Sequence, residues 1–147
     1  MAVQMSGQAA KNVAIARDLY EAFNQRDIKI HLAHDTEDVE IISMAFGQTF
    51  KGHQGVAEFL NGWMSAFPDG KVEITSVVAN DHCAVVEFTA RGTQSGPLKS
   101  PAGEIPPTNN KIDLKFCDVH TFRDGKLSQT RAYFDSATML RQLGLIK

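Results

Sequence analysis

The sequence lacks the features that mark membrane, secreted and nucleic-acid-binding proteins. Its 147 residues contain no apolar run long enough to span a bilayer, and residues 1–10 lack the basic start and apolar centre of a signal peptide. The 15 Lys and Arg residues are scattered and nearly balanced by 17 Asp and Glu residues. No basic patch for nucleic acid or anionic lipid results. We therefore expect a cytoplasmic protein with no nucleic acid or membrane partner.

Cysteine and metal-binding patterns are equally scarce. Cys83 and Cys117 stand alone in β-rich stretches without CxxC spacing, so we expect buried free thiols and no disulfide. His31 and His34 lie three residues apart beside Asp35, a spacing that could hold a metal, although a solvated helix end is the simpler interpretation. We predict neither a metal nor a cofactor.

The length is sufficient for one core, so we expect a flexible N-terminus over residues 1–10 and a single domain over residues 11–147. Apolar periodicity and turn signals define the elements. Ser136 is a candidate cap for the last helix. The predicted helices span residues 13–23, 28–34, 56–67 and 137–143, and the predicted strands span residues 39–44, 48–50, 72–79, 82–91, 111–122 and 127–134.

This order of elements predicts an α+β fold with helices on one face of a curved sheet, an arrangement that would enclose a cavity. The loop over residues 92–110 is long enough to form a rim or lid. Phe59, Trp63 and Phe67 form an apolar stripe on the third helix. Such a stripe is more often core than ligand wall, but this helix is the best candidate to line the cavity.

The strand over residues 111–122 carries the best candidate site. Alternation places Asp118 and His120 on the same face as apolar residues, the core-facing set being Ile112, Leu114, Phe116, Asp118, His120 and Phe122. Burying a carboxyl and an imidazole there is costly unless they are hydrogen-bonded or hydrated. The pair therefore indicates either a polar-lined pocket or a satisfied structural pair.

The turn that follows this strand decides what lies opposite Asp118. A two-residue turn at Asp124-Gly125 would place Arg131 there and favour a structural salt bridge. A turn with Gly125 in a bulge would shift the register by one residue. In that case Thr130, Ala132 and Phe134 would share the face of Asp118, and the carboxyl group would face an open pocket.

Several short segments resemble the SnoaL-like polyketide cyclases of the NTF2-like superfamily. The resemblance covers most of the chain. The segments are Ala22-Phe23-Asn24 with Asp27, the helix start over residues 52–59, Phe67-Pro68-Asp69, Pro106-Pro107-Thr108 with Lys111, Asp124-Gly125-Lys126-Leu127, Tyr133-Phe134-Asp135 and residues 140–144.

The resemblance implies a cone-shaped barrel of helices packed on a strongly curved mixed sheet, an apolar pocket and a homodimer. In these cyclases a His and an Asp promote aldol closure without a cofactor, and the corresponding positions here are Asp118 and Ala132. The ketosteroid isomerases of the superfamily instead carry a protonated Asp at the position of Asp118. Their general base falls near Ser43, and their tyrosine falls near Leu19, one place from Tyr20.

We therefore expect a small-molecule enzyme of the cyclase or isomerase type that performs acid/base chemistry on an apolar or polyketide-like ligand. A non-catalytic ligand-binding or dimerisation domain is the alternative, since Ala132 can remove no proton. Asp118 and His120 are the expected catalytic residues. The expected ligand-binding residues are Phe59, Trp63, Phe67, Phe116, Thr130 and Phe134.

Overall fold

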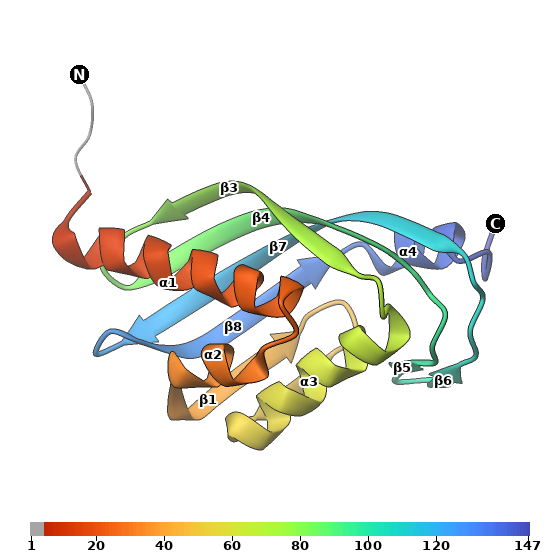
Figure 1. The fold of residues 1–147 in the computed structure, drawn as a ribbon, viewed down its shortest axis with the longest axis horizontal. Helices are drawn as coiled ribbons and strands as arrows, with labels where there is room; N and C mark the ends of the chain where they lie inside the picture. Colours follow the sequence, from red (N-terminus) through yellow and green to blue (C-terminus); the bar gives the residue numbers. More distant parts are fainter. Residues whose placement is uncertain (1–4) are drawn as a thin grey trace.

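A computed structural model of the chain describes residues 5–147 (Figure 1). Every predicted helix and strand is present, although several begin earlier than expected, and β5 and β6 are additional. The elements are α1 Gly7–Asn24, α2 Ile28–Ala33, β1 Asp35–Ser43, β2 Gln48–Lys51, α3 Gly52–Ala66, β3 Lys71–Ala79, β4 Cys83–Thr93, β5 Leu98–Ser100, β6 Gly103–Ile105, β7 Lys111–Arg123, β8 Lys126–Phe134 and α4 Ser136–Gln142.

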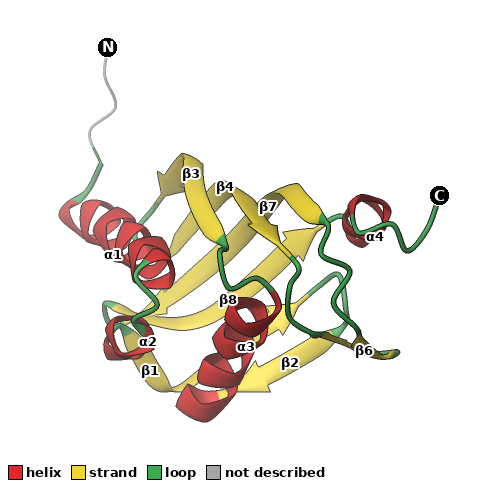
Figure 2. Cartoon of the chain, turned by 45° about the vertical axis from the view of Figure 1, so that its right-hand side comes forward, coloured by secondary structure: helices red, strands yellow, loops and turns green. Residues whose placement is uncertain are grey.

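Six strands form one curved sheet in the order β2-β1-β8-β7-β4-β3. Strand β1 pairs with β8 in parallel, while the other neighbours pair antiparallel, so the sheet is mixed. Helices α1, α2 and α3 cover one face of this sheet, and α4 lies beyond its end (Figure 2). The predicted α+β class and cone-like curvature are confirmed. The sheet stays open between its edge strands β2 and β3, so it does not close into a barrel.

Helix α1 begins earlier than its apolar pattern predicts because Ser6 caps it. The Ser6 hydroxyl accepts a hydrogen bond of 3.0 Å from the backbone N–H of Ala9. A serine at this position satisfies one of the N–H groups that a helix start leaves unpaired. The chain is therefore helical from Gly7 within the stretch that was predicted to be flexible. Residues 1–4 of that prediction lie outside the described residues.

Helix α4 is capped by Asp135 and not by Ser136, which corrects the predicted cap. The Asp135 carboxylate accepts hydrogen bonds from the backbone N–H groups of Ala137 and Thr138. A carboxylate suits this position because the N-terminus of a helix carries partial positive charge. The helix then buries Met139 against the end of the sheet.

The β7–β8 hairpin combines features of both predicted alternatives. Asp124 (φ 53°) and Gly125 (φ 78°) form a two-residue turn in the left-handed region, the geometry of a tight hairpin. One extra residue, Ser128, then interrupts the pairing of β8, and its hydroxyl donates to the Thr121 carbonyl oxygen at 3.0 Å. The bulge therefore lies at Ser128 and not at Gly125.

This bulge sets the register of the candidate site. Beyond it, Asp118 lies opposite Ala132, and His120 lies opposite Thr130. Without the extra residue, Arg131 would have faced Asp118. Of the two predicted alternatives, the observed register is the one in which Thr130, Ala132 and Phe134 share the face of Asp118.

The two cysteines differ from the prediction in burial. Cys83 and Cys117 are both partly exposed and not fully buried. Both thiols are free within the described residues, as expected. Among the same residues, none of the helices combines the length and apolar character that crossing a membrane requires.

The loop between β4 and β5 packs closely against the end of α3 at Gly96. The Gly96 N–H donates to the Ala66 carbonyl oxygen at 3.2 Å, and a Cβ on Gly96 would overlap the Ser65 carbonyl oxygen. We expect Gly96→Ala to lower the free energy of unfolding by about 3 kcal/mol, since backbone must move to relieve the overlap.

Gly62 provides a matched control, because a Cβ added there in the middle of α3 meets open space. Gly62→Ala should raise the free energy of unfolding by about 0.5–1 kcal/mol. Urea unfolding followed by circular dichroism measures both variants, and equal stabilities would contradict the packing described for Gly96.

Candidate functional site

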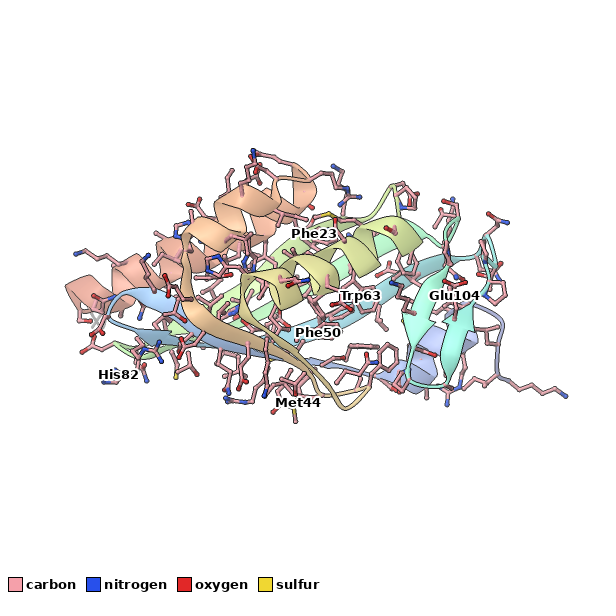
Figure 3. All side chains as sticks on the ribbon, turned by 90° about the horizontal axis from the view of Figure 1, so that it is seen from below. Phe23, Met44, Phe50, Trp63, His82 and Glu104 are labelled. Atoms are coloured by element: carbon pink, nitrogen blue, oxygen red, sulfur yellow. The ribbon has the colours of Figure 1, made fainter. Side chains whose placement is uncertain are left out.

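A cavity of about 110 Å³ lies between the helices and the covered face of the sheet. Helices α1, α2 and α3 contribute to its walls, and Trp63 points from α3 toward the sheet (Figure 3). Most lining side chains are aliphatic or aromatic. The polar or ionisable residues among them are Tyr20, His31, Lys71, Arg91, Asp118, His120 and Thr130. Such a cavity can hold an apolar molecule that presents a polar group to one wall.

A chain of hydrogen bonds joins four buried side chains in that wall. The Tyr20 hydroxyl donates to Asp118 Oδ2 at 2.7 Å and lies 2.8 Å from His120 Nε2. His120 Nδ1 in turn lies 2.7 Å from the Thr130 hydroxyl. Since the Tyr20 proton is directed to Asp118, the Nε2–H of His120 donates to Tyr20 and the Thr130 hydroxyl donates to Nδ1. The two strands and α1 thus hold Asp118 in one orientation.

Burial shifts the pKa values of all three titratable members of this group. It raises the pKa of Asp118 from 3.8 to about 7, against the Tyr20 hydrogen bond and the charge of His31, which lower it. It lowers the pKa of His120 from 6.5 to about 3, and the charge of His31 acts in the same direction. Burial, with the neighbouring Asp118, raises the pKa of Tyr20 well above 10. At neutral pH, His120 and Tyr20 are therefore uncharged, while Asp118 populates both protonation states.

One oxygen of Asp118 is unused. Oδ1 is buried and finds no hydrogen-bond partner among residues 5–147. Leaving such an atom unpaired costs about 1–3 kcal/mol. When Asp118 is protonated on Oδ1, the acid can donate to a carbonyl oxygen of a molecule in the cavity. The arrangement is thus suited to donating one proton to an apolar carbonyl compound.

The predicted solvated helix end is correct for His34 at the end of α2 but wrong for His31. His31 is buried, and its Nδ1 lies 3.0 Å from Asp35 Oδ2 in the core. His34 instead contacts Asp18 near the surface, with 3.1 Å between His34 Nε2 and the carboxylate. No group of three or more metal-binding side chains occurs in the described part of the chain.

The structure places most of the predicted site residues around one cavity. Asp118, His120, Phe59, Trp63, Phe67, Phe116 and Thr130 all line it. Phe134 differs, since it is not among the described lining residues and packs behind Phe116, with 4.8 Å between ring centroids. The sheet register brings Phe134 to the expected face, where it contacts Phe116 and Trp63 from outside the cavity lining.

Four polar or ionisable residues of the cavity were not predicted as site residues, namely Tyr20, His31, Lys71 and Arg91. Tyr20 lies in the apolar stripe of α1, where its ring suits the core and conceals the role of its hydroxyl group. Its only sequence signal is a phenol at a core position, which needs a partner when buried. His31 lies in α2, whose short sequence shows no regular apolar face, so its burial could not be predicted from periodicity.

Residues 16–130 match the family model of the SnoaL-like domain. The chain belongs to the SnoaL-like family. The predicted relationship is confirmed, and it rests on more than three quarters of the sequence. A search among curated proteins finds no match.

Solved structures agree with the SnoaL-like fold. A candidate SnoaL-like polyketide cyclase from Jannaschia sp. CCS1 superposes with a TM-score of 0.88 at 18% identity, over 99% of this chain and 100% of that one. IdmH, a candidate polyketide cyclase from Streptomyces antibioticus, gives 0.74 at 23% identity over 90% and 98%. A hypothetical protein with a ketosteroid isomerase-like fold from Catenulispora acidiphila DSM 44928 gives 0.74 at 15% over 90% and 93%.

The structure shows where the positions that correspond to catalytic residues of the SnoaL-like cyclases and ketosteroid isomerases lie. Ala132 lines the cavity directly opposite Asp118, where the cyclase resemblance implies an acid/base Asp. Ser43 pairs with Ala132 on β1 and is buried, but it is not among the described residues that line the cavity. Tyr20, one place from the expected tyrosine position, still brings its hydroxyl to Asp118.

Proposed function

We propose that this SnoaL-like chain is a small-molecule enzyme that performs cofactor-free acid/base chemistry on an apolar carbonyl compound. The buried carboxyl group of Asp118 carries the proposal, because its pKa of about 7 and its unpaired Oδ1 suit proton transfer at neutral pH. Protonated Asp118 would donate to the carbonyl oxygen and promote enolisation. Enolisation is the first step of both isomerase and aldol cyclase chemistry.

His120 contributes to this reaction through Tyr20. Its neutral imidazole donates to the Tyr20 oxygen, which keeps the Tyr20 proton directed at Asp118 Oδ2. The remaining oxygen of Asp118 is then the one available to the ligand. Flat aromatic ligands suit the walls, since Trp63 and Phe116 meet edge to face at 5.9 Å. Two of the similar structures belong to candidate polyketide cyclases, which supports a polyketide-like substrate.

The test is deuterium exchange at the α-carbon of 2-tetralone, a flat bicyclic ketone, followed by NMR in D2O. We expect the wild-type protein to accelerate exchange above the buffer rate. The enol-like phenol 2-naphthol should inhibit this exchange competitively. An exchange rate equal to that of buffer, at ketone concentrations that saturate binding, would contradict the proposal.

Ligand binding without turnover is the second candidate, and the apolar Ala132 opposite Asp118 favours it. In that case 2-naphthol should bind and quench Trp63 fluorescence, while 2-tetralone should exchange no faster than in buffer. Dimerisation is a separate proposal, supported by the exposed Val78 side chain on the edge strand β3. Sedimentation velocity tests it.

A further inference from the structure

The proposed reaction needs a second proton-transfer group, and the partner strand does not supply one. Asp118 can protonate a carbonyl oxygen, but enolisation also requires a base for the α-carbon proton. Ala132 faces Asp118 and has no titratable group. His120 cannot supply this base, because its Nε2–H donates to Tyr20 and its lone pair on Nδ1 accepts from Thr130. The base must therefore come from another wall of the cavity.

We propose that His31, oriented by Asp35, is the general base that removes the α-carbon proton of the substrate in this cavity. The proposal rests on the proposed function and adds a catalytic residue, His31, and a positioning residue, Asp35. It also narrows the substrate class to apolar ketones with an enolisable C–H bond.

The hydrogen bond between His31 and Asp35 determines which nitrogen is basic. Nδ1 lies 3.0 Å from Asp35 Oδ2. An ionised carboxylate only accepts hydrogen bonds, so Nδ1 carries the proton and the lone pair of the neutral ring is on Nε2. Nε2 has no hydrogen-bond partner within residues 5–147, whereas His31 lines the cavity. His31 is therefore a cavity residue whose Nε2 lone pair is free to accept a proton.

Asp35 is buried beside His31, where its side chain can orient the imidazole ring. It is 2% exposed, and its second oxygen, Oδ1, is buried without a partner among the described residues. Asp35 pairs with Leu127 at the start of β1, and the β1–β8 register shifts between Asp35 and Glu40. Asp35 is therefore placed to accept a hydrogen bond from Nδ1 and to orient the His31 ring.

His31 acts on the same space as the acid. His31 on α2 and Asp118 on β7 both line this one cavity. Other titratable or charged groups around the cavity are Tyr20 from α1 and Lys71 and Arg91 at the ends of β3 and β4. Helix α3 contributes apolar side chains to that wall. His31 and Asp118 thus form a base and an acid on one cavity.

The proton balance of the step closes without a cofactor. His31 Nε2 takes the α-proton, the C–H electron pair forms the C=C bond, and the carbonyl oxygen takes the Asp118 proton. The products are an enol, a His31 cation and an Asp118 carboxylate. In a ketone with a β,γ double bond, the His31 proton then goes to the γ-carbon while the Asp118 carboxylate takes back the enol proton, which completes an isomerisation. For ring closure, the enol carbon attacks a second carbonyl, His31 protonates the new alkoxide and Asp118 recovers the enol proton.

The experiment compares 2-tetralone exchange in His31→Gln, Asp35→Asn and the matched control His34→Gln, whose histidine contacts Asp18 near the surface. We expect His31→Gln to lower kcat by about 100-fold or more with little change in KM. Asp35→Asn should lower kcat by at least about tenfold, because the amide no longer fixes the proton on Nδ1. His34→Gln should match the wild type.

Two further measurements guard against effects on folding. Added imidazole should restore exchange to His31→Ala, since the ring can occupy the space that the substitution opens. In the wild-type protein, the nitrogen-15 resonance of His31 Nε2 should show an unprotonated nitrogen that shifts when 2-naphthol binds.

The outcomes separate the two proposals. Exchange that is lost in Asp118→Asn but kept within about threefold in His31→Gln would overturn the role of His31 and leave the proposed function intact. An unshifted, protonated Nε2 with bound 2-naphthol would overturn it as well. A wild-type protein that binds 2-naphthol without exchanging 2-tetralone would overturn the proposed function together with this inference.

Discussion

Replacing Asp118 with asparagine should abolish exchange and, at the same time, stabilise the protein above neutral pH. The amide has nearly the same shape as the carboxyl group but transfers no proton, so we expect the exchange rate to fall by about 100-fold to 10,000-fold. Exchange of 2-tetralone measures this loss. Asp113→Asn is the control, because Asp113 lies on the same strand with an exposed side chain paired to Arg91.

The gain in stability follows from the raised pKa of Asp118. Between pH 3.8 and about 7 the folded protein keeps a proton that the unfolded chain has released. Wild-type stability therefore falls as the pH rises through this window. Asparagine does not titrate, so the variant should gain on the wild type by about 4 kcal/mol across it.

His120 does not disturb this comparison. Its lowered pKa stabilises the folded state above pH 6.5, and that stability is lost as the pH falls toward about 3. The slope is opposite to that of Asp118, but it is present in both proteins and cancels in their difference. Urea unfolding from about pH 4 to about pH 8 measures the effect. Parallel pH profiles for Asp118→Asn and the wild type would show that the Asp118 pKa is not raised.

Tyr20→Phe should have the second largest effect, because one hydroxyl group serves two buried partners. Its loss leaves Asp118 Oδ2 and His120 Nε2 without the hydrogen bonds of 2.7 and 2.8 Å. Each unpaired group costs about 1–3 kcal/mol of stability. The pKa of Asp118 should also rise, since the Tyr20 hydrogen bond lowers it.

The pH profile of exchange separates this chemical effect from a loss of stability. Protonated Asp118 is the proposed acid, so the high-pH limb of the profile should move to higher pH in Tyr20→Phe. Tyr133→Phe, which removes a hydroxyl group from an exposed side chain on β8, should change neither stability nor profile. A Tyr20→Phe profile with an unmoved limb would contradict the role of the hydroxyl.

Local patterns predicted the elements well because each depended on neighbouring residues. The alternation in β7 correctly placed Asp118 and His120 toward the core, and the apolar stripe of α3 correctly placed Trp63 at a cavity wall. These features follow from periods of two and 3.6 residues, which any segment reveals by itself.

Features that depend on distant segments were not predictable in the same way. Tyr20 and Asp118 are 98 positions apart, and only the packing of α1 on the sheet brings them together. His31 and Asp35 are four residues apart, but their burial depends on the helices and strands around them. The turn residues narrowed the hairpin register to two alternatives but did not decide between them. The deciding bulge lies at Ser128, which gives no sequence signal as clear as a glycine.

The Ser128 bulge has a consequence for how such a site can arise or disappear in descent. Removing this single residue from β8 would bring Arg131 opposite Asp118 and create a salt bridge where Ala132 now borders the cavity. A change in chain length by one codon, with every other amino acid kept, would convert the proposed acid into a neutralised structural ion pair. In this hairpin, insertion and deletion can therefore alter the chemistry more than a point substitution on the same strand.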